Sequence, residues 1–215
     1  MRVLILILGF AALIAGAACT ASGVASLRTL DADDYMLSGP ARLTTSTFGF
    51  VGATKELAGR DSGLRDGAVT VRIRAVEGEN LFLGIAPREA ADAYLGAARR
   101  ELLDDVRYDP LEVRRTAVGA GDLPGPPGPA VPWAASAAGG APLELTWQAE
   151  NGDFIFVILR EDGSPGVDAV LEFGTKFRYQ RGFAMAGIAF GVFFIVVGLL
   201  LAFAALRRRE APPAG

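Results

Sequence analysis

The sequence predicts a membrane protein in which two transmembrane α-helices flank a mainly-β, β-sandwich-like domain with one short helix. The composition supports this, because 51% of the 215 residues are hydrophobic and only 21% are charged, with a mean hydropathy of +0.34. Two runs of 25 uncharged residues, at 3–27 and 182–206, are each long enough to cross a bilayer as a helix. Between them, several segments alternate apolar and polar residues with the two-residue period of a half-buried strand.

The N-terminal segment, residues 1–27, is expected to be a retained transmembrane helix, and two other readings stay open. A cleavable secretory signal also has a short basic start, an apolar run and small residues, and cleavage after Ala18 or Ala21 would fit. Cys19 follows small residues as the lipidated cysteine of bacterial lipoproteins does, but Gly16 stands where a larger aliphatic residue is usual. All three readings send the next region across the membrane.

The second span, residues 182–206, lies between Arg181 and the three arginines at 207–209. Charged flanks of this kind are typical of a membrane anchor. Because the first span begins like an export signal, we expect the N-terminus and the basic tail at 207–215 to be cytoplasmic. This topology predicts a plasma-membrane protein whose first partner is the lipid bilayer.

Residues 28–181 are then expected to form one extracytoplasmic domain, of a size that allows a proper core. They include 17 basic and 23 acidic residues, which gives a net charge of −6. Such a charge repels nucleic acid and anionic lipid headgroups. Nucleic acid is therefore not expected as a partner.

Alternation identifies the strands of this domain. Apolar residues occupy every second position in three segments, at 69–76, 143–147 and 167–173, and the segment 111–118 starts with the same alternation. Residues 154–159 (FIFVIL) are apolar on both faces, which predicts a central strand that is covered on both sides. The turn sequences at 151–153 and 162–166 are of the hairpin type, so the last three strands are expected to form a meander.

One helix and one long loop interrupt these strands. The helix is expected to open at Pro87 and to cap the sheet, with an apolar face made by Ala91, Tyr94, Leu95 and Ala98. Residues 119–140 are rich in Gly and Pro, which predicts a long surface loop or flexible insertion.

Two stretches of the domain resemble recurring segments of a protein family. They are LFLGIAPREAADAYLGAA at 81–98 and WQAENGDFIFVILREDGSPGVDAV at 147–170. They look like segments of uncharacterised actinobacterial two-span membrane proteins, in which an N-terminal span, an extracytoplasmic β-rich domain and a C-terminal span follow one another. The same order covers almost the whole chain, although Phe154 stands where that family more often has Trp. The resemblance implies an architecture and assigns no activity or site residue.

The residue types exclude most familiar active sites. The chain has no His and a single Cys, which excludes intrachain disulfides, Cys/His zinc sites and imidazole-based catalysis. Acidic residues cluster at 31–34, at 104–105 and at Glu150 with Asp153, without the ligand spacing of a calcium loop. We expect no catalytic residue, metal or cofactor, and a carboxylate-based envelope hydrolase is the least favoured alternative.

Two features could mediate binding. Trp133 lies in the Gly/Pro-rich segment and could contact a ligand there, whereas Trp147 is expected in the core. The second span contains a GxxxG motif, Gly187 to Gly191, and small residues at seven-residue spacing. The candidate helix-packing residues are Ala184, Gly187, Gly191 and Gly198. Their partner is either the first span, through the small step Ala12 to Gly16, a second copy of the chain, or another membrane protein.

These observations predict a non-enzymatic integral membrane protein that is a structural or accessory component of a cell-envelope or membrane complex. The alternative is an extracytoplasmic ligand-binding or sensing module with its site at the 119–140 loop and Trp133. That alternative predicts that Trp133→Ala abolishes a ligand-dependent fluorescence change without lowering stability.

Overall fold

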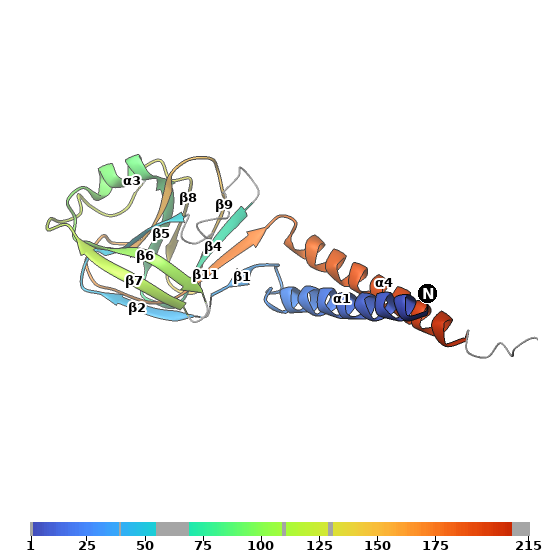
Figure 1. Cartoon of the computed structure of the whole chain (residues 1–215). Coiled ribbons are helices and arrows are strands. Elements are labelled where there is room, and N and C mark those ends of the chain that lie inside the picture. The colour runs from blue at the N-terminus through green and yellow to red at the C-terminus, as the bar shows by residue number, and fades with distance from the viewer. Residues whose placement is uncertain (1, 39, 55–68, 109–110, 129–130, 208–215) are drawn as a thin grey trace, which may run out of the picture. The chain divides into compact units, whose positions relative to one another are not determined.

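The computed structural model describes residues 2–38, 40–54, 69–108, 111–128 and 131–207. The chain divides into two compact units (Figure 1). One unit, here called the helix pair, consists of Met1–Asp34 and Tyr179–Gly215 and contains α1 (Arg2–Arg28) and α4 (Gln180–Arg207). The other, here called the two-sheet domain, is Tyr35–Arg178, and its described residues form eleven strands and α3 (Arg88–Leu95). The predicted order of a long apolar helix, a mostly-β domain with one short helix, and a second long apolar helix is confirmed.

In the helix pair, α1 and α4 lie side by side and antiparallel. Gly9 of α1 packs on Gly198 of α4, Gly16 on Gly191 and Gly23 on Ala184, so numbers rise along one helix as they fall along the other. No Pro interrupts either helix, and both are long and apolar enough to cross a membrane. The tail beyond Arg207 lies outside the described residues.

The two-sheet domain is built from a five-stranded and a six-stranded sheet. In the five-stranded sheet the order is β1 (Met36–Leu37), β11 (Val167–Phe177), β4 (Val69–Gly78) and β9 (Leu143–Gln148), and β2 (Ala41–Thr45) also pairs with β11. In the six-stranded sheet the order is β7 (Leu111–Val118), β6 (Arg100–Tyr108), β3 (Gly49–Ala53), β10 (Phe154–Arg160), β5 (Leu81–Pro87) and β8 (Ala135–Gly139). Every neighbouring pair is antiparallel except β3 with β6, which is parallel.

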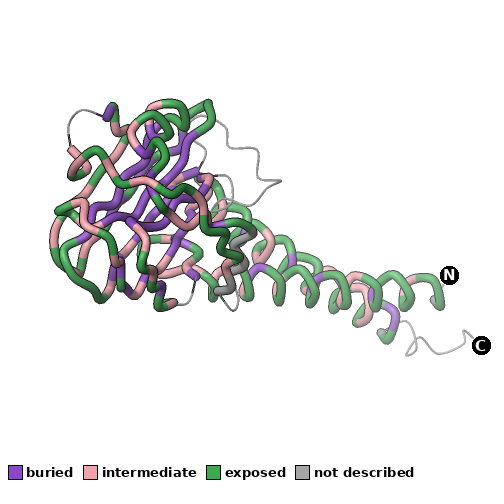
Figure 2. The backbone as a smooth tube through the Cα atoms, turned by 90° about the vertical axis from the view of Figure 1, so that its left-hand side faces the viewer, coloured by how far each residue is buried: buried purple, intermediate pink, exposed green. Residues whose placement is uncertain are grey.

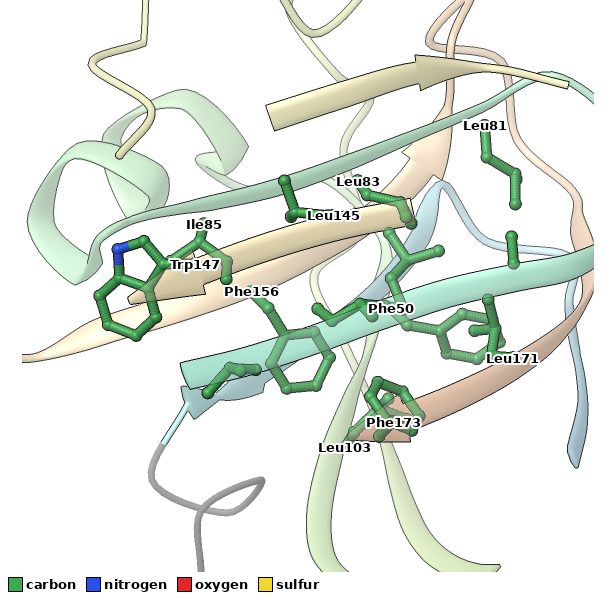
Figure 3. Close-up of a cluster of buried hydrophobic side chains, with 14 of the residues drawn as sticks. Phe50, Leu81, Leu83, Ile85, Leu103, Leu145, Trp147, Phe156, Leu171 and Phe173 are labelled. Atoms are coloured by element: carbon green, nitrogen blue, oxygen red, sulfur yellow. The ribbon is translucent and has the colours of Figure 1, made fainter. Parts of the chain in front are cut away.

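The main core lies between the two sheets. Figure 3 shows Phe50 and Phe156 of the six-stranded sheet beside Leu171 and Phe173 of the five-stranded sheet, and the rings of Phe156 and Phe173 lie 5.7 Å apart. The alternating segments supply its inward-facing residues, as predicted: Val71, Ile73 and Ala75 of β4 are buried, and so are Val167, Ala169, Leu171 and Phe173 of β11.

A second apolar cluster covers the outer face of the six-stranded sheet. Ile155, Val157 and Leu159 of β10 face Ala91 and Leu95 of α3 in this cluster. Since Phe156 and Ile158 belong to the main core, β10 is covered on both faces, as its continuous apolar sequence predicts. The helix begins at Arg88, directly after the predicted Pro87, and it caps the sheet as expected. Figure 2 shows that the buried residues are concentrated in the two-sheet domain, whereas the helices are mostly exposed.

The predicted meander is wrong. Strand β9 pairs with β4, β10 pairs with β3 and β5, and β11 returns to β4, so consecutive strands alternate between the two sheets. The physical reason is burial. A strand that is apolar on both faces needs a layer on each side, and the six-stranded sheet provides one through the second apolar cluster. The turn sequences permit a tight reversal, but they do not specify that the next strand joins the same sheet.

The segment predicted as a loop at 119–140 contains structure. Residues 135–139 form β8, which pairs with β5 at one edge of the six-stranded sheet. Backbone pairing at an edge needs no large side chain, so this Ala/Ser/Gly strand carries no strong sequence signal. The preceding residues Leu123, Val131 and Trp133 pack onto the second apolar cluster. This part of the chain therefore covers the sheet.

Candidate functional site

The helix contact is the site that the structure builds from the predicted residues. Ala184, Gly191 and Gly198 of α4 are buried in a line that faces α1. A Cβ atom added at Gly191 would lie 2.7 Å from the carbonyl oxygen of Gly16, and one added at Gly198 would lie 2.7 Å from that of Gly9. These distances leave no room for a side chain. Gly187 is only half-buried, and a Cβ there would meet the Cys19 carbonyl oxygen at an ordinary 3.8 Å.

The matching residues of α1 are Gly9, Gly16 and Gly23, which the sequence analysis did not identify as a set. Added Cβ atoms at Gly16 and Gly23 would approach the carbonyl oxygens of Gly191 and Ala184 to 2.6 and 2.7 Å. The predicted step from Ala12 to Gly16 is half right, because Ala12 is only partly buried. Seven-residue spacing was the signal that could have found the set.

The periodicity of the contact defines its geometry. Both helices repeat their small residues every seven positions, which is the repeat of two helices that coil around each other in the left-handed sense. A GxxxG contact repeats every four residues and is typical of right-handed crossings. The contact therefore follows the seven-residue pattern, and the GxxxG motif contributes chiefly through Gly191.

An ion pair joins the start of α4 to the short segment that follows α1. The Arg181 guanidinium donates to the Asp34 carboxylate at 2.9 Å. Asp34 has a φ of +68°, an uncommon conformation for a residue other than glycine. Its backbone N–H donates to the carbonyl of Asp31, so the chain turns sharply where α1 ends.

The two-sheet domain holds both of its chain connections next to each other. The Ser38 N–H donates to the Phe173 carbonyl at 2.7 Å, and the Phe173 N–H donates to the Ser38 hydroxyl at 2.9 Å. The guanidinium of Arg72 lies 3.5 Å from the centre of the Tyr35 ring. Arg72 is only 7% exposed and also pairs with Glu144 at 3.3 Å. The first residues of the domain are therefore fastened to β4 and β11.

The Trp133 side chain packs within the domain and does not project freely into solvent. Its ring packs 4.9 Å from that of Phe82, and its indole N–H donates to the Gly128 carbonyl at 3.1 Å. Tyr94 contacts the same ring and donates to the Gly125 carbonyl at 2.8 Å, and burial raises the pKa of Tyr94 to about 12. These contacts fasten the Gly/Pro-rich segment over the sheet. Trp147 lies in the main core, as expected, against Phe154.

A charged cleft of about 450 Å³ lies at the turns that follow β4 and β10, and it includes Asn80 and Glu161. Arg160 bridges the carboxylates of Glu79 and Asp162 there. Hydrogen bonds from Arg160, and from Ser164, hold the pKa of Asp162 well below its usual range. A general acid of glycoside hydrolysis needs a raised pKa, so this carboxyl group has the opposite character.

Within the described part of the chain, no three His, Cys, Asp or Glu side chains gather as a metal ion would require. In the acidic segment at 31–34, the Asp34 carboxylate accepts a hydrogen bond from Arg181. Asp153 pairs with Arg88 at 2.6 Å, in place of a calcium-type arrangement with Glu150. No protein-family model, curated protein or solved structure matches this chain.

Proposed function

We propose that this protein is a non-enzymatic two-span component of the plasma membrane that presents its two-sheet domain on the extracytoplasmic side. Its role is structural or accessory within a cell-envelope or membrane complex. The proposal rests above all on where large apolar side chains are exposed, and the export-signal-like start of the first span supports the orientation.

The two units differ sharply in their exposed surface. Among the described residues, Met36 is the only exposed large hydrophobic residue of the two-sheet domain. On the helix pair, large hydrophobic side chains are exposed along both helices, from Val3 to Ile14 on α1 and from Phe183 to Leu206 on α4. A surface of this extent is far larger than soluble proteins tolerate, and lipid is the solvent that suits it.

The accessory role is supported by the way the domain is held. Met36 of β1, directly after Tyr35, pairs with Thr175 near the end of β11, so the domain is anchored at two adjacent points. Two anchors limit how far a domain can reach and keep it close to the bilayer. Several described charged residues of the domain form ion pairs with each other, such as Arg42 with Asp168.

The role is tested by purifying the tagged full-length chain from its native membrane in a mild detergent. Mass spectrometry identifies what co-elutes, and light scattering gives the mass of the particle. The proposal predicts a second protein in constant ratio to the chain. The exposed-surface variants Phe190→Ala on α4 and Arg114→Glu on β7 then locate the contact. A lone chain of 22.5 kDa in its detergent micelle would contradict the accessory role.

The orientation is tested separately with Thr146→Cys, an exposed position on β9, in a Cys19→Ser background. A membrane-impermeant maleimide should label this cysteine in intact cells. Labelling that requires permeabilised cells would contradict the extracytoplasmic placement.

A further inference from the structure

Of the residues around the conceivable cleavage points after Ala18 and Ala21, Thr20 belongs to the helix contact, whereas Ala18, Cys19 and Ala21 are exposed. They continue α1, which runs without a break from Arg2 to Arg28. The Thr20 backbone nitrogen would lie only 2.6 Å from a Cβ added at Gly191. The Thr20 hydroxyl donates to the Gly16 carbonyl at 2.8 Å, so its polar group is satisfied inside the pair.

Removal of the residues before either point would dismantle the contact. Gly9 and Gly16 precede both, and they supply two of the three close approaches between the helices. Gly191 and Gly198 would then present a glycine-lined groove with nothing of α1 in it. The three matched small positions share one seven-residue period over the length of α1, a match that a temporary targeting segment does not require.

We infer that α1 is retained in the mature protein as the permanent partner of α4, and that this pairing itself prevents processing between residues 18 and 21. Proteolysis requires backbone that is exposed and free of stable structure. Here the backbone is helical throughout, and at Thr20 it is packed against α4. Because Cys19 would become an N-terminal residue only after cleavage before it, the same pairing excludes its lipidation as a lipoprotein anchor.

This inference rests on the proposed two-span arrangement and goes beyond it. It also assigns the small-residue face of α4 to α1, so a foreign partner must contact either the outward faces of the helices or the two-sheet domain. A chain that lost α1 would still be anchored through α4. Failure of the inference therefore leaves the accessory role intact, whereas a lone chain in the co-purification would leave the inference intact.

The test is the intact mass of the full chain, tagged at its C-terminus and purified from membranes. Two variants of α4 leave the whole sequence of α1 unchanged, so neither alters the cleavage points themselves. Gly191→Leu forces the helices apart, because an added Cβ there already meets Thr20 and the Gly16 carbonyl oxygen. Gly182→Leu is the matched control, because nothing lies within 4 Å of its added Cβ.

The wild type and Gly182→Leu should have masses that include residues 1–18, and Gly191→Leu should be shortened to begin after Ala18 or Ala21. If Gly191→Leu yields no protein, Gly198→Leu opens the pair at its other end and should be shortened in the same way. A wild-type chain that lacks residues 1–18 would overturn the inference. Full-length Gly191→Leu and Gly198→Leu would overturn the role of the pairing.

Discussion

The contact between the two helices is made by the smallest residues of the protein, whereas the core between the two sheets contains some of its largest side chains. Gly16 and Gly191 bring two backbones together, while Phe156 and Phe173 fill the space between two layers. Lipid is as apolar as a leucine side chain, so burying apolar side chains does not stabilise a helix pair in a bilayer, and close packing of the two backbones does. A domain in water, in contrast, is stabilised by burying apolar area. Adding atoms should therefore damage the first contact, and removing atoms should damage the second.

The largest effect is expected from Phe156→Ala in the main core. Phe156 is fully buried, and its loss should lower the free energy of unfolding by about 3–5 kcal/mol through lost burial and the cavity left behind. Denaturant unfolding of the full-length protein in detergent, followed by the fluorescence of its two tryptophans, measures this change. The control Thr146→Ala, at an exposed position, should alter stability by no more than about 0.5 kcal/mol. Equal stability of the two variants would show that the domain does not depend on this core.

The opposite substitution should damage the helix pair. Gly191→Leu adds atoms where none fit and should destabilise the pair by about 1–3 kcal/mol, the usual range for overpacking. The unprocessed full-length chain, made by cell-free synthesis into detergent so that residues 1–21 are kept, is titrated with sodium dodecyl sulfate and followed by far-ultraviolet circular dichroism. The variant should show an earlier transition. Gly182→Leu should behave like the wild type. If both variants shifted the transition equally, the seven-residue contact would not be the one that holds the helices.

A smaller effect is expected where the chain enters the two-sheet domain. Tyr35→Leu removes the aromatic face that Arg72 covers, which should cost about 0.5–2 kcal/mol of domain stability. Tyr35→Phe keeps the ring and should retain most of that stability. The same denaturant experiment compares them, and a Phe variant as weak as the Leu variant would assign the effect to the hydroxyl group instead.

The smallest effect concerns pH and the surface of the domain. Hydrogen bonds from Arg42, at 2.9 and 2.7 Å, hold the pKa of Asp168 below its ordinary value. A lowered pKa in the folded state means that this carboxylate stabilises the fold above the unfolded pKa of about 3.9, and that the contribution is lost as pH falls below it. Asp168→Asn should therefore be slightly less stable than the wild type at pH 7 and equal to it once the pH falls below the folded-state pKa of Asp168. A difference that persists under those acidic conditions would rule out the ion pair as its cause.

Sequence patterns were sufficient where one physical constraint dominates. Charge-free length identifies α1 and α4, and alternation identifies β4 and β11, because each pattern follows directly from the surroundings of the element. The continuous apolar run of β10 predicted its cover on both faces. The parallel pairing of β3 with β6 had no such signal, because register and partner choice depend on the assembled sheets.

The candidate site was predicted on one side only. Ala184, Gly191 and Gly198 were identified by their seven-residue spacing, while the search along α1 used the four-residue step from Ala12 to Gly16. The role of Gly9 and Gly23 becomes evident only when α4 is placed beside α1, because each of them packs on a residue of α4. Trp133 was placed in a loop because Gly and Pro surround it, but its packing on Phe82 depends on distant residues of the sheet.

The most direct test of the account is whether α1 and α4 of the same chain touch at the predicted positions. A Cβ at Gly9 would lie 3.3 Å from that of Leu201, close to the separation of about 3.5–4.5 Å in disulfides. In a Cys19→Ser background, Gly9→Cys with Leu201→Cys should cross-link within one chain on mild oxidation in the membrane. Gly9→Cys with Leu200→Cys should not, because Leu200 is exposed. Equal cross-linking of both pairs, or a disulfide-linked dimer in place of an internal bridge, would contradict the account.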